Sequence, residues 1–394
     1  MGLNDTVSAE RIHISFFGRR NAGKSSLVNA VTGQELSVVS EIKGTTTDPV
    51  KKAMELLPLG PVLITDTPGI DDEGLLGEKR TGKSKNEIRK TDIAVIVADG
   101  CEGSGEWEKE LTGIFSRRNV PFVIAYTKAD LMAEVPQNTE NEIYTSSVTG
   151  YGIEELKNRL SAFADEVKNS KLIVADLIMP GDTVVLVIPI DGSSPKGRII
   201  LPQQLTLREL LDYHCTAVCC RPEELKQTLS SLKEPPALVI TDSQVFEQVG
   251  KIVSRSTRLT SFSILFARYK GELGELVKGA RALSGLKSGD TVLISEGCTH
   301  HRQCNDIGTV KLPGWIEKYT GVKPGYLFTS GGEFPDNLSG ISLIVHCGGC
   351  MLNEKEMHSR IEKAKEKGVP IVNYGIAIAQ MHGILDRSLE VFES

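Results

Sequence analysis

Gly18-Arg19-Arg20-Asn21-Ala22-Gly23-Lys24-Ser25 has the spacing G-x-x-x-x-G-K-S, which is typical of a phosphate-binding loop. The apolar run 12–17 precedes this loop and a helical pattern over 25–31 follows it, as the motif requires. Its glycines let backbone N–H groups surround a β-phosphate, and the helix N-terminus adds a positive dipole. We expect Lys24 to bridge the β- and γ-phosphates and the Ser25 hydroxyl to bind Mg²⁺. The predicted nucleotide-binding residues here are Gly18, Asn21, Ala22, Gly23, Lys24, Ser25 and Ser26.

Two more motifs belong to the phosphate side of the same site. Asp66-Thr67-Pro68-Gly69 ends an apolar run. We expect Asp66 to hold Mg²⁺ through water and the Gly69 N–H to meet the γ-phosphate. Gly44-Thr45-Thr46-Thr47-Asp48 lies in the loop before that run, where Thr46 can cap the metal. These motifs predict a catalytic set of Lys24, Ser25, Asp66 and Gly69.

The base side of the site is indicated by two later segments. Thr127-Lys128-Ala129-Asp130 follows another apolar run, and its carboxylate can accept both N1–H and the exocyclic amine of guanine, which adenine does not offer. Ser146-Ser147 stands where a base-contacting loop belongs. Five motifs in this order predict a GTPase. The remaining predicted nucleotide-binding residues are Thr45, Thr46, Asp66, Gly69, Thr127, Lys128, Asp130, Ser146 and Ser147.

Short apolar runs alternate with helical patterns along the whole chain, which predicts an α/β protein with largely parallel sheets. We expect a phosphate-loop GTPase domain followed by two further α/β domains, with bounds 1–170, 171–268 and 269–394. Strands expected in the second half are 184–190, 237–241, 261–265, 291–295, 341–345 and 370–374. The helices expected between them lie near 206–213, 222–232, 243–252, 272–284, 352–367 and 376–389.

Composition and charge exclude several classes of protein. The 394 residues are 24% charged and 40% hydrophobic, as in ordinary globular domains. A net charge of −6 argues against nucleic-acid binding as the main role. No apolar run approaches the ~18 residues needed to span a bilayer, and residues 1–10 do not resemble a signal peptide. We therefore expect a cytoplasmic protein with neither membrane nor nucleic-acid partners, whose eight cysteines are reduced.

Two cysteine motifs follow two of the expected buried strands. Cys298-Thr299-His300-His301 comes after 291–295, and His346-Cys347-Gly348-Gly349-Cys350 comes after 341–345. The carboxyl ends of parallel strands meet at one edge of a sheet, where ligands bind. These residues permit an iron–sulfur cluster, a structural Cys₃His zinc site or no metal at all. Cys215, Cys219 and Cys220 lie in an apolar run beside His214 and are expected to be small core residues.

Residues 10–165 resemble the translation-factor-related GTPases of the tRNA-modification and Era-like group. Two positions depart from that group: Thr127 replaces the usual asparagine, and Ile70 stands where Ras-like proteins carry a water-orienting glutamine. Asn21 matches the asparagine that helps this group to bind potassium in place of an arginine finger. The resemblance therefore implies slow, potassium-stimulated GTP hydrolysis.

The GTPase motifs together with the two cysteine motifs resemble the [FeFe]-hydrogenase maturation GTPases over essentially the whole chain. That resemblance implies a homodimer with a central dimerisation domain and a C-terminal domain that carries a [4Fe–4S] cluster. It also implies a scaffold that receives a diiron precursor, made with two radical-SAM maturases, and passes it to the apo-hydrogenase. Cys298, Cys347 and Cys350 match the cluster thiolates, and His300 and His346 match the motif histidines.

The fourth cluster ligand stays open, because His301, Cys304 and Asp306 add donors that lie outside the family pattern. An exogenous group could also fill that position. The rival interpretation is a GTPase of RNA modification or ribosome assembly with a structural zinc domain. It predicts a colourless protein with a basic RNA-binding face, and the sequence pI near 5.8 counts against it.

Overall fold

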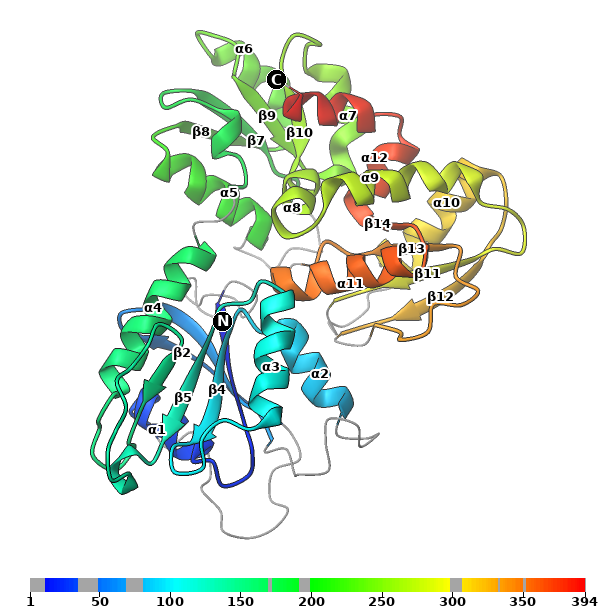
Figure 1. Cartoon of the computed structure of the whole chain (residues 1–394). Coiled ribbons are helices and arrows are strands. Elements are labelled where there is room, and N and C mark those ends of the chain that lie inside the picture. Colours follow the sequence, from blue (N-terminus) through cyan, green and yellow to red (C-terminus); the bar gives the residue numbers. More distant parts are fainter. Residues whose placement is uncertain are drawn as a thin grey trace. The chain divides into compact units, whose positions relative to one another are not determined.

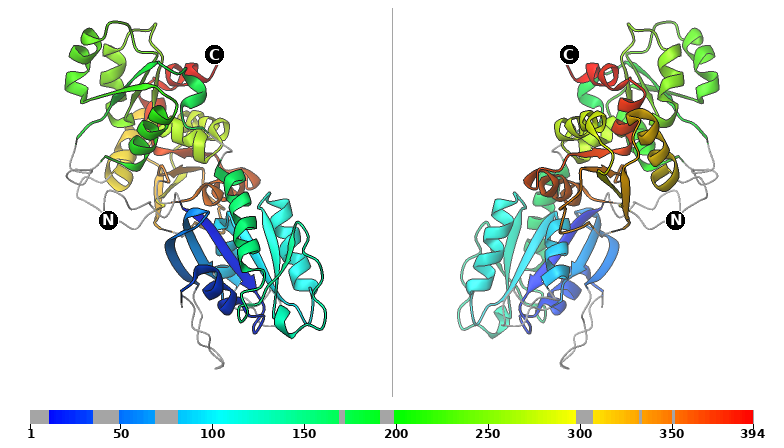
Figure 2. Two further views of the ribbon diagram at one scale, coloured as in Figure 1. Left: turned by 90° about the vertical axis from the view of Figure 1, so that its left-hand side faces the viewer. Right: turned by 90° about the vertical axis from the view of Figure 1, so that its right-hand side faces the viewer.

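A computed structural model describes residues 11–34, 49–68, 81–168, 172–190, 199–297, 307–331, 334–349 and 352–393 (Figures 1 and 2). The chain divides into two compact units, residues 1–170 and 171–394, and each is described by itself. The described residues contain no helix that is both long and apolar enough to cross a membrane.

The first unit is built on a six-stranded sheet with the order β2-β3-β1-β4-β5-β6. Every neighbouring pair is parallel except β2 and β3, which run antiparallel. The carboxyl ends of β1, β3 and β5 therefore lie at the same edge of the sheet. The elements are β1 Ile12–Gly18, α1 Lys24–Thr32, β2 Val50–Leu56, β3 Gly60–Asp66, α2 Thr81–Lys90, β4 Ile93–Asp99, α3 Glu106–Arg117, β5 Phe122–Thr127, β6 Glu142–Tyr144 and α4 Ile153–Lys168.

Helices cover both faces of this sheet (Figure 1). Strand β4 shows the consequence, since its side chains alternate between two cores. Val95 joins the core beneath α1 and α4, and Ile96 joins the core beneath α2 and α3. Because both faces are buried, the strand reads as a continuous apolar run rather than an alternating one.

The second unit contains two four-stranded parallel sheets, with the orders β10-β9-β7-β8 and β12-β11-β13-β14. The elements around the first sheet are β7 Thr183–Val187, α5 Leu201–Asp212, β8 Thr216–Cys220, α6 Leu225–Ser231, β9 Leu238–Thr241, α7 Phe246–Ile252, β10 Leu259–Ser261 and α8 Phe262–Lys270. Those around the second are α9 Leu273–Ala282, β11 Thr291–Ser295, α10 Leu312–Thr320, β12 Gly325–Thr329, β13 Leu343–His346, α11 Glu354–Glu366, β14 Ile371–Asn373, α12 Tyr374–Met381 and α13 Leu385–Leu389.

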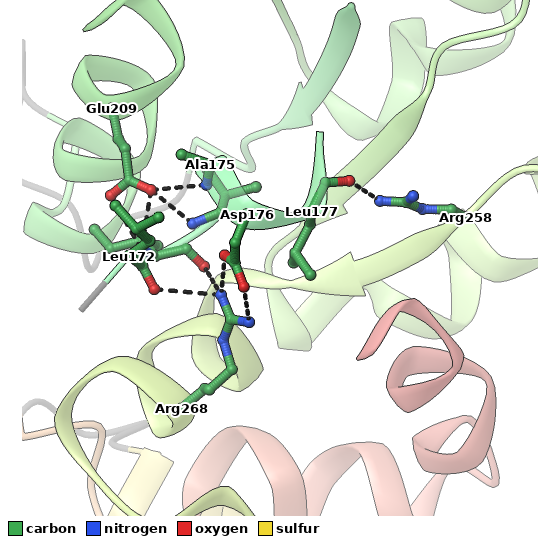
Figure 3. A network of polar contacts seen from close by, with 9 residues as sticks. Leu172, Ala175, Asp176, Leu177, Glu209, Arg258 and Arg268 are labelled. Carbon is green, nitrogen blue, oxygen red and sulfur yellow. Dashed lines mark hydrogen bonds and ion pairs between the residues drawn. The ribbon is translucent and has the colours of Figure 1, made fainter. Parts of the chain in front are cut away.

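A polar network fastens the first residues of this unit to its own helices (Figure 3). The Glu209 carboxylate on α5 accepts the N–H groups of residues 173, 174 and 175 at 2.8–3.0 Å. The Arg268 guanidinium on α8 makes two 2.7 Å hydrogen bonds with Asp176. Arg258 donates to the Leu177 carbonyl. Glu209 and Arg258 thus hold main-chain groups of residues 173–177, and Arg268 holds the Asp176 side chain. Together these contacts fix the path by which the chain enters the unit.

The last described segment returns to the first sheet of the unit. Arg387 on α13 donates to the carbonyls of Gly250, Val253 and Ser254 at 2.7–3.0 Å. The Thr260 hydroxyl of β10 donates to the Ser388 carbonyl at 3.1 Å. Helix α13, which follows the second sheet in the sequence, is therefore bound to residues 250–254 and to β10 of the first sheet.

The predicted fold class is confirmed: a phosphate-loop GTPase domain precedes further α/β structure with parallel sheets. Two predicted elements are wrong. The expected strand 261–265 ends at Ser261, whose side chain accepts the Ile264 N–H and begins α8. The expected helix 376–389 is two helices, because Gly383 takes φ 68° between them.

Candidate functional site

The phosphate loop joins the end of β1 to the start of α1. Its Gly23 adopts φ 77° and Asn21 adopts φ 63°, a region that glycine and asparagine tolerate better than other residues. A Cβ atom on Gly18 would lie 3.0 Å from the Val97 carbonyl oxygen of β4, so the loop begins tightly packed against the sheet. The loop is thus a tight turn with two left-handed residues, as a phosphate-binding loop requires.

Three predicted catalytic residues meet at the end of β3. The Lys24 ammonium forms an ion pair with the Asp66 carboxylate, and both side chains are only 8% exposed. The Ser25 hydroxyl donates to the other oxygen of Asp66 at 2.9 Å. A cation-binding carboxylate, a hydroxyl and an ammonium group therefore share one small volume. This is the donor set that Mg²⁺ and a nucleotide β/γ-phosphate require.

Thr127 connects the base side of the site to the phosphate loop. Its hydroxyl donates to the Ala22 carbonyl at 2.7 Å and lies 3.2 Å from the Ala98 carbonyl oxygen. A Cβ atom on Gly23 would lie 3.1 Å from the same hydroxyl. Thr127 therefore holds the loop backbone, even though it lacks the amide of an asparagine.

The two other base-side residues are each held by a partner. The Ser146 hydroxyl donates to the Asp130 carboxylate. Lys128 has φ 60°, and its ammonium group lies 2.5 Å from the Asp99 carboxylate at the end of β4. Burial raises the pKa of Asp99, but hydrogen bonds from Lys128 and the Cys101 N–H outweigh burial and lower the pKa overall. The ionised Asp99 carboxylate thus holds the Lys128 ammonium group in place. Ser26 is half-buried, and Ser147 is exposed.

Several predicted site residues lie outside the described residues. On the phosphate side these are Thr45, Thr46 and Gly69. At the cysteine motifs they are Cys298, His300, His301, Cys304, Asp306 and Cys350. Their roles stay predictions.

The strands that precede the two cysteine motifs in the sequence are neighbours, because β11 and β13 pair with Ser295 opposite His346. The Gly297 N–H donates to the Cys347 sulfur at 3.0 Å, and the Gly349 N–H donates to the same sulfur at 3.4 Å. The Cys347 sulfur thus accepts two backbone N–H groups, one from each of the two segments. A Cβ atom on Gly297 would lie 2.7 Å from Leu352, so this backbone packs too tightly for a larger residue.

His346 precedes this cysteine, is completely buried and has both ring nitrogens in hydrogen bonds. Its Nδ1 lies 2.7 Å from the Cys347 carbonyl oxygen, and its Nε2 lies 2.9 Å from Nη1 of Arg360. Burial, with a further contribution from the Arg360 charge, lowers the pKa of His346 to about 3. The imidazole is therefore neutral at physiological pH.

The sequence predictions missed two residues that contact predicted site residues: Arg360, which contacts His346, and Asp99, which contacts Lys128. Arg360 lies 14 residues after His346 on α11, and Asp99 lies 29 residues before Lys128. The only available sequence signal was the Glu356–Arg360 spacing of four, which is common on helix surfaces. Here that pair is buried, with Nη2 of Arg360 2.6 Å from the Glu356 carboxylate.

Cys347 and its surroundings fit an iron–sulfur cluster in donor chemistry, since thiolates that accept backbone N–H groups suit iron. Within the described ranges, no group of three or more histidine, cysteine, aspartate and glutamate side chains is placed to hold a metal ion. Of the cysteines expected in the core, Cys215 and Cys220 are buried as predicted, whereas Cys219 is exposed.

Three family models match successive parts of the chain. Residues 13–128 match the 50S ribosome-binding GTPase family, residues 173–271 match the hydrogen maturase F dimerization domain, and residues 274–391 match the hydrogen maturase F tetramerization domain. The curated relatives match the first part. GTPase Der of Kosmotoga olearia is 29% identical over 177 residues, which cover 40% of this chain and 40% of that protein.

A second relative, the tRNA modification GTPase MnmE of Francisella tularensis subsp. novicida, is 30% identical over 161 residues, or 39% of this chain and 36% of that protein. The chain thus spans 40% or less of the length of these two relatives. Among solved structures, the G domain of the T. maritima FeoB iron transporter matches 39% of this chain and 99% of its own, with 24% identity and a TM-score of 0.31.

Proposed function

Because the chain belongs to the hydrogen maturase F family, we propose that it is an iron–sulfur scaffold that matures [FeFe]-hydrogenase and is controlled by GTP. In this proposal the protein receives a diiron precursor that is made with two radical-SAM maturases. It then delivers that precursor to the apo-hydrogenase. The GTPase domain supports binding of GTP with Mg²⁺ and GTP hydrolysis, and the two oligomerization domains support self-association.

One observation supports the scaffold role most directly. The Cys347 sulfur accepts the N–H of Gly297, the residue immediately before Cys298 in the sequence. The pairing of β11 and β13 thus places the residue before Cys298 against Cys347, 50 residues further along the chain. We propose that Cys298, Cys347 and Cys350 hold a [4Fe–4S] cluster there. When bound, the cluster would supply an iron position at which the precursor can dock.

On the GTPase side, the proposal assigns each residue a task in hydrolysis. Lys24 neutralises charge on the β- and γ-phosphates, while Ser25 and Asp66 position Mg²⁺. Asp130, held by the Ser146 hydroxyl, accepts the guanine N–H groups. We propose that Asn21 helps to place a potassium ion, and that hydrolysis is slow because Ile70 cannot orient water.

Anaerobic reconstitution with iron and sulfide tests the scaffold role. We expect about four iron atoms per chain with the visible and EPR spectra of a [4Fe–4S] cluster. The Cys347→Ala variant should lose these spectra but keep GTP hydrolysis, because the described catalytic residues all lie in the first unit. Cys219→Ala changes an exposed cysteine of the second unit, the unit that contains Cys347. It is the matched control and should keep both the cluster spectra and GTP hydrolysis. Tightly bound zinc without cluster absorbance would instead support the rival zinc-domain interpretation.

Replacing potassium by sodium tests the role of Asn21. Wild-type hydrolysis should be slower in sodium. The Asn21→Gly variant can keep the φ 63° backbone but lacks the amide oxygen, so it should hydrolyse GTP at the same slow rate in both salts. An equal rate of the wild type in both salts would rule out the potassium role and leave the scaffold role unaffected.

A further inference from the structure

The hydrogen bonds of His346 define which of its nitrogens carries the proton. Nε2 lies 2.9 Å from Nη1 of Arg360, and a guanidinium can only donate. Nε2 must therefore be the unprotonated acceptor. The proton then resides on Nδ1, which donates to the Cys347 carbonyl 2.7 Å away. Neither nitrogen has a lone pair left for a metal.

Arg360 is held in this position by several groups at once. It is 3% exposed, and its Nη2 donates to the Glu356 carboxylate at 2.6 Å and to the Gly331 carbonyl at 3.2 Å. Its guanidinium also lies 5.3 Å from the centre of the Phe334 ring. Removing the guanidinium from His346 would leave several buried polar groups without partners, which is costly.

The chain of contacts continues to the sulfur. Through Nδ1, His346 holds the carbonyl of Cys347, and the sulfur of the same residue accepts the Gly297 N–H at 3.0 Å. The position of this sulfur thus depends on a relay that runs from Arg360 through His346. Groups that orient a metal ligand in this way affect metal affinity without touching the metal.

We propose that Arg360 is a positioning residue of the cysteine site: it occupies Nε2 of His346, so that His346 orients Cys347 and is not itself a ligand of the cluster. This inference rests on the proposed scaffold function. It reassigns one of the two motif histidines, which the family resemblance had left as a possible ligand. The donors in residues 299–306 and an exogenous group then remain as candidates for the fourth iron position.

The first experiment asks whether a His346 nitrogen binds iron. The full chain, labelled with ¹⁵N-histidine, is reconstituted and reduced, and the hyperfine spectrum of its cluster is compared with that of His346→Gln. A glutamine amide can still accept from Arg360, which keeps the arginine satisfied. We expect the two spectra to show the same nitrogen couplings. A directly bonded nitrogen coupling that disappears in His346→Gln would overturn the inference.

The second experiment tests the relay itself by the rate at which a chelator removes iron. The double variant Arg360→Met/Glu356→Gln avoids leaving a buried carboxylate unpaired and should release iron about 10-fold faster than the wild type. Arg360→Lys restores a donor for Nε2 and should release iron at close to the wild-type rate. Glu356→Gln alone leaves the bond between Arg360 and His346 and is the matched control. Equal rates in all four proteins would contradict a positioning role.

A third measurement needs no cluster. Nitrogen NMR of the labelled, metal-free chain should show His346 as the neutral tautomer protonated at Nδ1, and the double variant should lose this signature. A protonated Nε2 in the wild type would overturn the inference. If the wild type assembles no cluster, the proposed scaffold function fails together with this inference. If a cluster assembles with His346 as a ligand, only this inference fails.

Discussion

At the scale of single residues, Thr127 links two parts of the nucleotide site. Its hydroxyl reaches the Ala22 carbonyl from the end of β5, so a hydrogen bond joins the base-side segment to the phosphate loop. The side chain is almost completely buried, at 2% exposure. A buried hydrogen bond of this kind contributes about 1 kcal/mol, mainly because its loss leaves a carbonyl without a donor.

We predict that Thr127→Ala weakens GTP binding about 5-fold, which corresponds to about 1 kcal/mol. Titration with a fluorescent guanine nucleotide measures this change. Thr127→Ser keeps the hydroxyl and should bind within about 2-fold of the wild type. If the alanine and serine variants bound GTP equally well, the hydroxyl would have no part in holding the loop.

At the residue scale, the predicted side chains that the structure brings together are those whose signal is local in sequence. Lys24 and Ser25 are neighbours in the phosphate loop, and Asp66 ends the strand next to β1, so the parallel sheet brings the three together. Arg360 could not be assigned in this way, because its partnership with His346 depends on how α11 packs against β13. Spacing alone does not encode that packing.

At the scale of elements, α9 packs unusually close to β14, and one glycine permits it. A Cβ atom on Gly279 would lie 1.9 Å from the Ile371 carbonyl oxygen and 2.4 Å from the Ile371 carbonyl carbon. These are backbone atoms of β14 in the second sheet, which cannot move aside like the end of a flexible side chain. The helix and strand would have to separate to accept any larger residue.

We predict that Gly279→Ala lowers the free energy of unfolding of the second unit by about 3 kcal/mol. Gly274→Ala on the same helix is the matched control. A Cβ atom on Gly274 would meet no atom within 4 Å. This variant should therefore leave the free energy of unfolding unchanged or raise it by up to about 1 kcal/mol. Urea unfolding followed by Trp315 fluorescence in a Trp107→Phe background reports on this unit, since the chain has two tryptophans. Similar losses in both variants would refute the close-packing argument.

Element predictions from the sequence failed where a cap or an exposed strand decided the outcome. The segment 261–265 was expected to be a strand, yet Ser261 caps a helix that starts within it. Strand β12 was missed because its residues are mostly exposed and give neither a continuous apolar run nor a clear alternation. The cap is a single local hydrogen bond that composition does not report, and the exposure of β12 depends on tertiary contacts.

At the scale of the whole molecule, the second unit is closed by α13. We predict that Arg387→Met lowers the free energy of unfolding of this unit by about 3 kcal/mol, because three carbonyls of residues 250–254 lose their donor. Arg281→Ala removes only an exposed ion pair with Asp386 and should change stability by less than about 0.5 kcal/mol. The same Trp315 assay applies, and an unchanged midpoint in Arg387→Met would show that α13 does not close the unit.

Self-association gives a further prediction, which concerns β12 at one end of the second sheet. Among the described residues, no strand pairs with its outer edge, and Leu327 and Phe328 are 52% and 42% exposed. This strand lies in the part that matches a tetramerization domain. We expect Leu327→Lys to raise the dissociation constant of the larger assembly about 10-fold, measured by light scattering over a concentration series. Leu131→Lys, an equally drastic change at an exposed leucine of the first unit, should leave the assembly intact.

The return of α13 to residues 250–254 also sets an order of events during synthesis. Residues 171–270 leave the ribosome well before residue 387, so the first sheet of the second unit must wait, incompletely covered, for the Arg387 contacts. The cysteines at 298, 347 and 350 emerge within that interval. A nascent chain therefore exposes these cysteines before its fold is closed.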